Sequence, residues 1–175
     1  INEMKTINSI DRRRRRHIYY EFKTEGRWIF SPLFLSFALL DYLNYPELTT
    51  TWLLWRLCFV ATMFLSFHLL TRSFIRHRHT EALVLVNLAL ACNIINYMVY
   101  QTGGYSSYYI TGVILASVVG LEIFRLSFKY SLAALIINYG PTLGIIHWSA
   151  GTTNIELATT QSVFIIGMAL IQAVS

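Results

Sequence analysis

Charge is scarce in this chain of 175 residues. Only 13% of the residues are Asp, Glu, Lys or Arg, whereas about a quarter are charged in ordinary soluble domains. Hydrophobic types make up 55%, and the mean hydropathy is +0.49. A soluble fold of this length has too small an interior to bury so much apolar surface. The composition therefore argues against a soluble enzyme, a disordered tail and a disulfide scaffold, and indicates a membrane protein.

Cysteine and catalytic motifs are scarce as well. The two cysteines, Cys58 and Cys92, both lie inside apolar stretches, so no disulfide framework is expected. The chain contains no phosphate-binding glycine loop, no nucleophile elbow and no zinc-protease motif. His68 lies in the inner half of the second apolar run and His147 at the outer end of the fifth, and this difference in depth argues against a haem held by two histidines. We therefore expect no catalytic residue, metal or cofactor in this segment.

Long hydrophobic runs, in contrast, fill most of the sequence. There are six, of 18 to 25 residues each, and about 20 residues are needed for a helix to cross a bilayer. A helix also satisfies its backbone polar groups internally, as lipid demands. We therefore predict an all-α polytopic membrane protein, in which a head (1–27) precedes a bundle of six transmembrane helices (28–175). The predicted spans are Trp28–Tyr45, Thr51–Ile75, Glu81–Gln101, Ser106–Phe128, Lys129–Ser149 and Leu157–Ser175.

Positive charge is confined to alternate connectors. Three connectors lack Lys and Arg entirely, namely Pro46–Thr50, Thr102–Tyr105 and Ala150–Glu156. The head and the other two connectors are basic. Because positive charge is retained on the cytoplasmic side, we predict that both termini are cytoplasmic.

The head carries the strongest charge in the chain, the run Arg12–Arg16. A basic cluster beside a first span is typical of a segment that contacts anionic lipid headgroups. Nucleic acid is the poorer interpretation, since no folded basic domain accompanies the cluster. Aromatic and apolar residues are mixed with charges over 17–28, and this mixture predicts a helix lying at the interface.

Two ionisable residues lie at similar depth in the outer half of the first hairpin. Asp41 is one turn from the end of the first span, and Arg56 is about a turn and a half into the second. Ionisable groups in a membrane interior are functional candidates by default. The two residues are interpreted either as a structural ion pair that locks the hairpin or as part of the wall of an outward-opening ligand pocket.

A polar stripe marks the third span. Asn93, Asn96, Tyr97 and Tyr100 follow the spacing of one helix face, and we expect this face to point into the bundle. It is explained either by hydrogen bonds between helices or by a ligand pocket. The candidate ligand-binding residues therefore lie in the outer half, on the first three spans and the fifth: Asp41, Tyr42, Trp52, Arg56, Asn93, Asn96, Tyr97 and His147.

The fourth and fifth spans contain small residues and one proline. Pro141 is expected to kink the fifth span. Gly140 and Gly144 are expected to allow close contact with another helix, and the pairs Ala116/Gly120 and Ala169/Ala173 repeat the same spacing. Near the end of the fourth span, Glu122 and Arg125 have the i, i+3 spacing of a local ion pair.

The first hairpin also resembles a known class of sensor. Its residues are Asp41-Tyr42-Leu43-Asn44-Tyr45-Pro46 followed by Leu53-Leu54-Trp55-Arg56. An acidic residue with Tyr, a Pro turn and an early Arg resembles the six-helix membrane modules that precede bacterial signalling enzymes. These enzymes are quorum-sensing histidine kinases, class III adenylate cyclases and diguanylate cyclases. The resemblance implies a homodimer, a ligand site within the bundle and an enzyme joined after residue 175.

The sequence thus favours a sensor or receptor module of the bacterial inner membrane. It would bind a small lipophilic ligand within the bundle and regulate a cytoplasmic nucleotide cyclase or histidine kinase. Two other interpretations stay open. One is a fragment of a transporter or permease, and the other is a passive membrane anchor and dimerisation domain.

The charge pattern generates a topology prediction. In a variant with both native cysteines replaced, a cysteine introduced at Thr102 or Thr152 should react with a membrane-impermeant thiol reagent applied from outside. A cysteine at His79 should react only after the membrane is permeabilised. Labelling in the reverse pattern would contradict the orientation.

Overall fold

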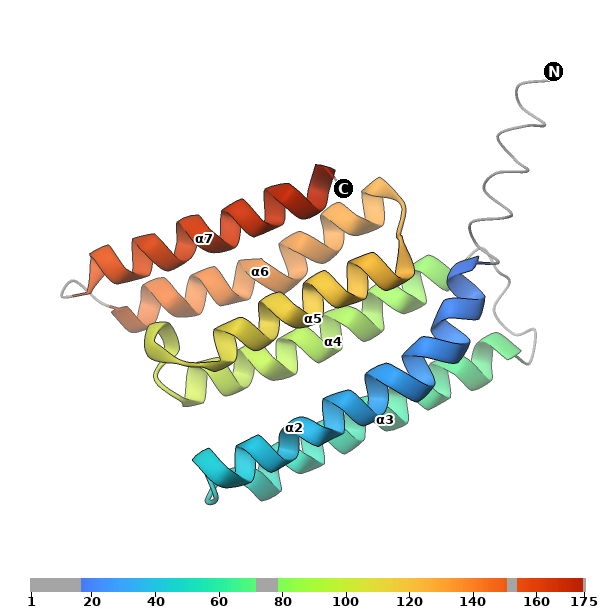
Figure 1. Cartoon of the computed structure of the whole chain (residues 1–175), viewed down its shortest axis with the longest axis horizontal. Helices are drawn as coiled ribbons and strands as arrows, with labels where there is room; N and C mark the ends of the chain where they lie inside the picture. The colour runs from blue at the N-terminus through green and yellow to red at the C-terminus, as the bar shows by residue number, and fades with distance from the viewer. Residues whose placement is uncertain (1–16, 72–78, 151–153, 175) are drawn as a thin grey trace. The chain divides into compact units, whose positions relative to one another are not determined.

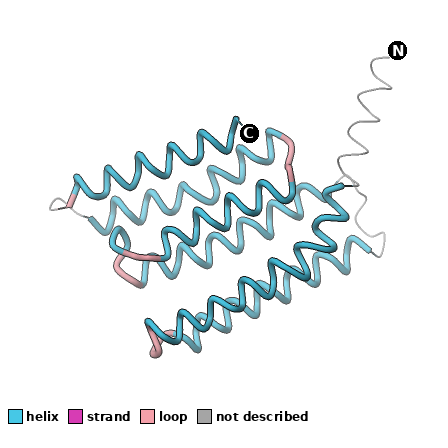
Figure 2. Tube along the Cα trace, viewed as in Figure 1, coloured by secondary structure: helices cyan, strands magenta, loops and turns pink. Residues whose placement is uncertain are grey.

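Helix makes up nearly all of the chain that the structure describes. The structure is a computed structural model that describes residues 17–71, 79–150 and 154–174. No strand occurs within these ranges (Figures 1 and 2), so the all-α class is confirmed. The elements are η1 (Phe22–Phe30), α2 (Ser31–Asn44), α3 (Thr49–Thr71), α4 (Thr80–Gln101), η3 (Gly104–Ser106), α5 (Tyr109–Phe124), α6 (Phe128–Ala150) and α7 (Ile155–Val174).

Each predicted span coincides with a helix, and α5 departs furthest from its predicted bounds. A single 3-10 turn, η3, precedes it, so α5 begins at Tyr109 rather than Ser106. It ends at Phe124 because Arg125 has a left-handed backbone, with φ 42°. The predicted pairing of Glu122 with Arg125 assumed one continuous helix, and that assumption is wrong. The last residues of the predicted second span, 72–75, lie outside the described residues.

Three helices are long and apolar enough to cross a membrane, over Thr49–Leu70, Thr80–Gln101 and Ile155–Gln172. Trp28–Asn44 and Tyr109–Phe124 are apolar but shorter. Helix α6 has 23 residues, but polar side chains and glycines interrupt its apolar sequence. The structure thus supports a membrane protein with at least some spanning helices, in an all-helical chain.

The chain divides into two compact units. Unit 1 comprises residues 1–87 with 123–125, and unit 2 comprises residues 88–122 and 126–175. Each of the two is described by itself. Helix α4 begins in unit 1 and contributes most of its length to unit 2.

Unit 1 is built around the α2–α3 hairpin. The turn at Tyr45 is held by its N–H, which donates to the Asp41 carbonyl at 2.7 Å, and by the Leu48 N–H, which donates to the Tyr45 carbonyl at 3.1 Å. Before α2 the chain is helical from residue 17 without a break, and η1 is wound with wide π-type turns. The helix therefore continues through the predicted boundary between residues 27 and 28. Pro32 lies within this continuous helix and has no N–H, so one backbone hydrogen bond is missing there.

An aromatic cluster forms the inside of the hairpin. The rings of Phe34 and Phe59 lie 4.6 Å apart, and Phe30 packs edge-on to Phe59 at 6.1 Å. All three side chains are buried. Such ring pairs add about 0.5–1.5 kcal/mol beyond the area that they bury, so they hold η1 and α2 against α3.

Unit 2 contains the remainder of α4 with η3, α5, α6 and α7. In Figure 1 its helices run as a set of neighbours, with α6 between α5 and α7. Gly103 and Gly104 turn the chain after α4 with φ of 100° and 59°, values that suit glycine. A Cβ on Gly104 would also collide with the Ser149 side chain on α6. Both glycines are thus required in this turn.

Of the predicted small-residue pairs, the one that contains Gly120 makes a close contact between helices, and the Gly140–Gly144 pair does not. A Cβ on Gly120 would lie 2.5 Å from a methyl carbon of Leu88, so α5 and α4 approach closely at that point. A Cβ on Gly140 or Gly144 would meet nothing within 4 Å. The expectation that these two glycines pack against a helix is wrong within this chain, because their side of α6 is exposed.

The contact at Gly120 generates a stability prediction. Gly120→Leu should lower the free energy of unfolding by about 1–3 kcal/mol, because an overpacked helix contact must shift backbone or rotamers. The matched control is Gly140→Ala, which enters open space and should cause no loss. Thermal denaturation of the two variants in the same lipid or detergent tests this, and equal stabilities would contradict the close contact.

Candidate functional site

The two ionisable residues of the first hairpin form a buried ion pair in unit 1. Arg56 Nε donates to Asp41 Oδ2 at 2.8 Å, and Arg56 Nη2 donates to Asp41 Oδ1 at 3.1 Å. Asp41 is 0% exposed and Arg56 is 2% exposed. The predicted coupling of these residues is therefore confirmed, in the two-bond geometry that Arg and carboxylate groups prefer.

The hairpin itself brings the pair together. Asp41 lies in the last turn of α2, Arg56 lies in the second turn of α3, and the turn between them is short. The remaining guanidinium end is also used, since Arg56 Nη1 donates to the Phe34 carbonyl at 2.9 Å. The guanidinium carbon lies 4.9 Å from the centre of the Phe34 ring, within cation–π range.

This arrangement favours a structural role for the pair. Both carboxylate oxygens of Asp41 and all three guanidinium nitrogens of Arg56 take part in hydrogen bonds within unit 1. A ligand that used either group would have to break a buried charge-assisted bond. In the conformation seen, the pair locks α2 to α3 rather than offering free polar atoms to a ligand.

The two predicted aromatic residues of this unit face different ways. Trp52 is fully buried, and its ring lies edge-on to Tyr45 with centroids 5.5 Å apart. Tyr42 is 61% exposed. Trp52 thus belongs to the packing of the hairpin, whereas Tyr42 lies on its surface.

The polar stripe of α4 does not face the interior of unit 2 as a whole. Tyr97 and Tyr100 are 42% and 60% exposed, whereas Asn96 is 2% exposed. Asn93 is half-buried, and its amide returns to the Ala89 carbonyl of its own helix at 2.8 Å. The expectation of an inward stripe is therefore wrong except at Asn96. Small and apolar residues, among them Cys92, occupy the inward face instead and let neighbouring helices approach.

Asn96 joins α4 to α6. Its Nδ2 donates to the Asn138 carbonyl at 3.0 Å, and its Oδ1 accepts from the Thr142 hydroxyl at 2.6 Å. The Thr142 hydroxyl also lies 3.0 Å from the Asn138 carbonyl. Of the two explanations for Asn96, the structure thus shows the hydrogen bond between helices.

The same network reaches α5 through residues that the sequence did not single out. Asn138 Nδ2 donates to Ser117 Oγ at 3.1 Å, and Ser117 Oγ lies 3.5 Å from Cys92 Sγ. Asn138, Ser117 and Thr142 are each 0% exposed. We call Cys92, Asn96, Ser117, Asn138 and Thr142 the α4–α6 polar network. One signal was available, because Asn138 and Thr142 stand four apart and flank Pro141.

Two bonds connect α6 to α7. The Tyr139 hydroxyl donates to Gln172 Oε1 at 3.2 Å. His147 Nε2 lies 3.0 Å from Ser162 Oγ, and the Ser162 hydroxyl also lies 2.8 Å from the Ala158 carbonyl of its own helix. His147, one of the predicted ligand residues, is therefore exposed but tied to the last helix.

The connection after α4 is hydrogen-bonded to α6 and α7. The Tyr105 N–H donates to Ser149 Oγ at 2.8 Å, and the Tyr105 hydroxyl accepts from Asn154 Nδ2 at 2.9 Å. Gln161 Nε2 donates to the Tyr105 carbonyl at 2.6 Å. Tyr105 is thus held by polar groups of α6, of α7 and of the residue that precedes α7.

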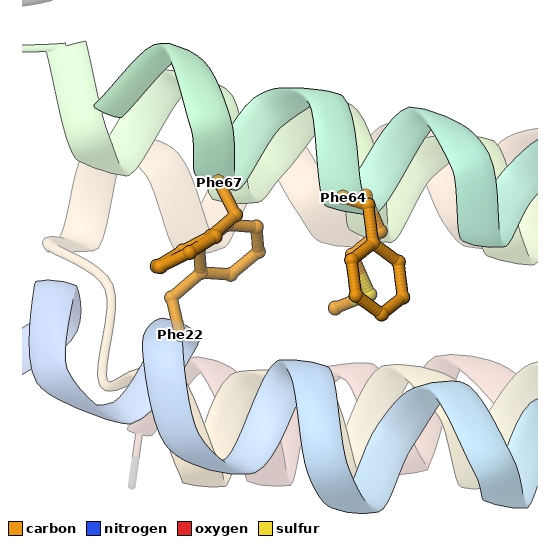
Figure 3. Close-up of a pocket in the computed structure, with 4 residues that line it drawn as sticks. Phe22, Phe64 and Phe67 are labelled. Atoms are coloured by element: carbon orange, nitrogen blue, oxygen red, sulfur yellow. The ribbon is translucent and has the colours of Figure 1, made fainter. Parts of the chain in front are cut away.

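A small apolar crevice lies between η1 and α3 in unit 1. Phe22, Met63, Phe64 and Phe67 line it (Figure 3). This lining offers no charge or hydrogen-bonding side chain to orient a ligand. Among the described residues, no three His, Cys, Asp or Glu side chains gather as a metal site would require.

The predicted ligand residues therefore belong to two separate groups. Asp41, Tyr42, Trp52 and Arg56 lie in unit 1, and Asn93, Asn96, Tyr97 and His147 lie in unit 2. Comparisons with protein-family models, curated proteins and solved structures find no match to this chain. A function is therefore inferred from the geometry and chemistry of the side chains.

The ion pair generates a prediction of non-additive mutations. Arg56→Ala should destabilise the chain by about 3–5 kcal/mol, because it leaves the Asp41 carboxylate buried without its partner. Arg56→Ala combined with Asp41→Leu should recover part of that loss, since no unpaired charge remains. Unfolding of the single and double variants in detergent provides the measurement. Strictly additive losses would show that the two residues have independent roles.

Proposed function

We propose that this chain is a sensor module with six membrane-spanning helices. In this proposal it binds a small lipophilic ligand inside the helix bundle. It thereby regulates a cytoplasmic signalling enzyme, a nucleotide cyclase or a histidine kinase, joined on its C-terminal side. The module would lie in the bacterial inner membrane as a homodimer, in contact with membrane lipids and with both termini in the cytoplasm.

Six spans are supported by the helix lengths together with the charge pattern. At 1.5 Å per residue, the 23 residues of α6 reach roughly 35 Å, more than a bilayer core of about 30 Å. The 16 residues of α5 reach roughly 24 Å, a deficit that local thinning of the bilayer or tilting of neighbours accommodates. Helix α2 gains length from η1, with which it is continuous. The connectors without Lys or Arg alternate with basic ones, as an even number of spans requires.

One observation carries the sensing role: the α4–α6 polar network is buried in the middle of apolar helices. Polar groups are costly in a membrane interior and mark functional positions there. A passive anchor does not need a side-chain network that joins three helices. Tyr139, next to Asn138 in sequence, connects α6 to α7 through Gln172. A rearrangement of the network has a direct path to the last helix, which precedes the proposed enzyme.

Regulation requires two states of the bundle with different affinities for the ligand. Helix α6 offers a place for the change, because Pro141 lies inside it and cannot donate a backbone hydrogen bond. Gly140 and Gly144 flank this position and meet no neighbouring atoms. A bend of α6 at Pro141 would alter the network on one side and the contacts with α7 on the other.

A passive anchor is the second candidate, and a specific observation favours it. Asp41, Arg56 and Asn96 use their polar atoms in bonds within the chain, as residues that only stabilise a bundle would do. An anchor would hold an enzyme at the membrane without responding to small molecules. The two functions therefore differ in their response to ligands.

The test uses the chain in lipid nanodiscs and, in parallel, fused ahead of a nucleotide-cyclase catalytic domain. The probes are medium-chain alkyl alcohols and primary amides, with the alkane and the carboxylate of equal length as controls. We expect saturable thermal stabilisation by a neutral polar probe, about 2–4 °C for each kcal/mol of binding energy, and a change in cyclase output over the same concentration range. No response, or an equal response to the alkane, would favour the anchor.

A further inference from the structure

Asn138 carries an unused hydrogen-bonding group in the centre of unit 2. Its Oδ1 atom is buried and has no hydrogen-bond partner, and the side chain is 0% exposed. An unsatisfied polar atom in such a place is unfavourable for the folded state. The other atoms of this kind in the described residues belong to Thr80, Asn87, Gln161 and Gln172. Asn138 differs from them in belonging to the network that joins α4, α5 and α6.

The open position does not depend on which way the amide is turned. As placed, Nδ2 donates to Ser117 Oγ at 3.1 Å and Oδ1 is open. If the amide were reversed, the Ser117 hydroxyl would donate to Oδ1 and Nδ2 would be open instead. One end of the Asn138 amide therefore lacks a partner in either orientation.

We infer that Asn138 is the polar anchor for the ligand, and that the ligand presents to it an uncharged group able to donate and accept hydrogen bonds. This inference rests on the proposed sensor function. The side chains that the network places around Asn138 are Cys92, Asn96, Ser117 and Thr142, and none of them carries a formal charge when the thiol is protonated. A charged ligand would be left without a counter-charge in a buried site, which is strongly unfavourable. A hydroxyl or a carboxamide group suits either orientation of the amide.

Access to this anchor requires α6 to move. Asn138 and Ser117 are fully buried, so the conformation described is the closed one. Asn96 Nδ2 donates to the Asn138 carbonyl, and the Thr142 hydroxyl donates to Asn96 Oδ1, so a bend of α6 at Pro141 would strain both bonds between α4 and α6. Ligand bonds to the Asn138 amide replace part of that loss and favour the bent state. Because the Tyr139 hydroxyl donates to Gln172 at 3.2 Å, a bend of α6 would also displace α7.

The inference is tested with variants of the whole chain in nanodiscs and the same neutral probes. Asn138→Leu removes the anchor and keeps a side chain of similar size. Its matched control is Asn87→Leu, because Asn87 is also buried, bonded to a serine and open at Oδ1, but lies in unit 1. We expect the half-saturating probe concentration to rise about tenfold in Asn138→Leu, as for one lost hydrogen bond, and by less than twofold in Asn87→Leu.

Photo-crosslinking gives a second measurement that does not depend on the folding of a variant. An alkyl alcohol carrying a diazirine should label wild-type residues of α4, α5 or α6 close to the network, and excess unlabelled alcohol should compete. Labelling confined to α2 and α3 would overturn the anchor. If the wild-type chain responds to the probes but Asn138→Leu responds equally, the anchor is wrong and the sensor function stands. If the wild-type chain does not respond at all, both are wrong.

Discussion

A polar atom inside an apolar helix has no water to bind, so it must find its partner within the chain. This constraint accounts for most of what holds the two units together. In unit 1 it joins Arg56 to Asp41 and to the Phe34 carbonyl. In unit 2 it joins Asn96 to α6 and Asn138 to α5. Because apolar side chains gain little by leaving lipid for another helix, these bonds and close packing specify which helices associate.

The two units use this constraint for different purposes. The Asp41–Arg56 pair is fully satisfied and joins the two helices of a short hairpin. The aromatic cluster of Phe30, Phe34 and Phe59 forms the inside of the same hairpin. The network of unit 2 is more fragile, because it lies beside Pro141 and leaves one end of the Asn138 amide without a partner. A fully bonded ion pair is suited to hold two helices together, whereas a network with an open hydrogen-bonding position beside a proline is suited to respond. We therefore place the proposed sensing in unit 2.

Whether a predicted residue position was confirmed depended on the kind of sequence signal behind the prediction. Asp41 and Arg56 were predicted to pair because both are charged, stand at equal depth and are joined by a short turn, and the pair is confirmed. The stripe on α4 was predicted from polarity alone, and it is wrong for Tyr97 and Tyr100. Tyrosine is enriched at membrane surfaces, so its polar hydroxyl does not require a position inside the bundle. Asn96 differs because its amide needs partners, which it finds at Asn138 and Thr142.

The sequence by itself determined where the helices lie, since long apolar runs separated by turn residues predict helices and little else. It marked Asp41 as a candidate partner of Arg56, and the structure decided that the two residues pair. It did not determine which side of each helix meets another helix. Membrane helices are apolar on nearly every side, so the hydrophobic pattern that reveals the inward face of a soluble helix is missing. Only the tertiary structure showed that Gly120, and not Gly140, marks a close contact. It also brought Ser117, Asn138 and Thr142 to Asn96, because contacts between residues more than 20 positions apart depend on how helices pack and not on local sequence.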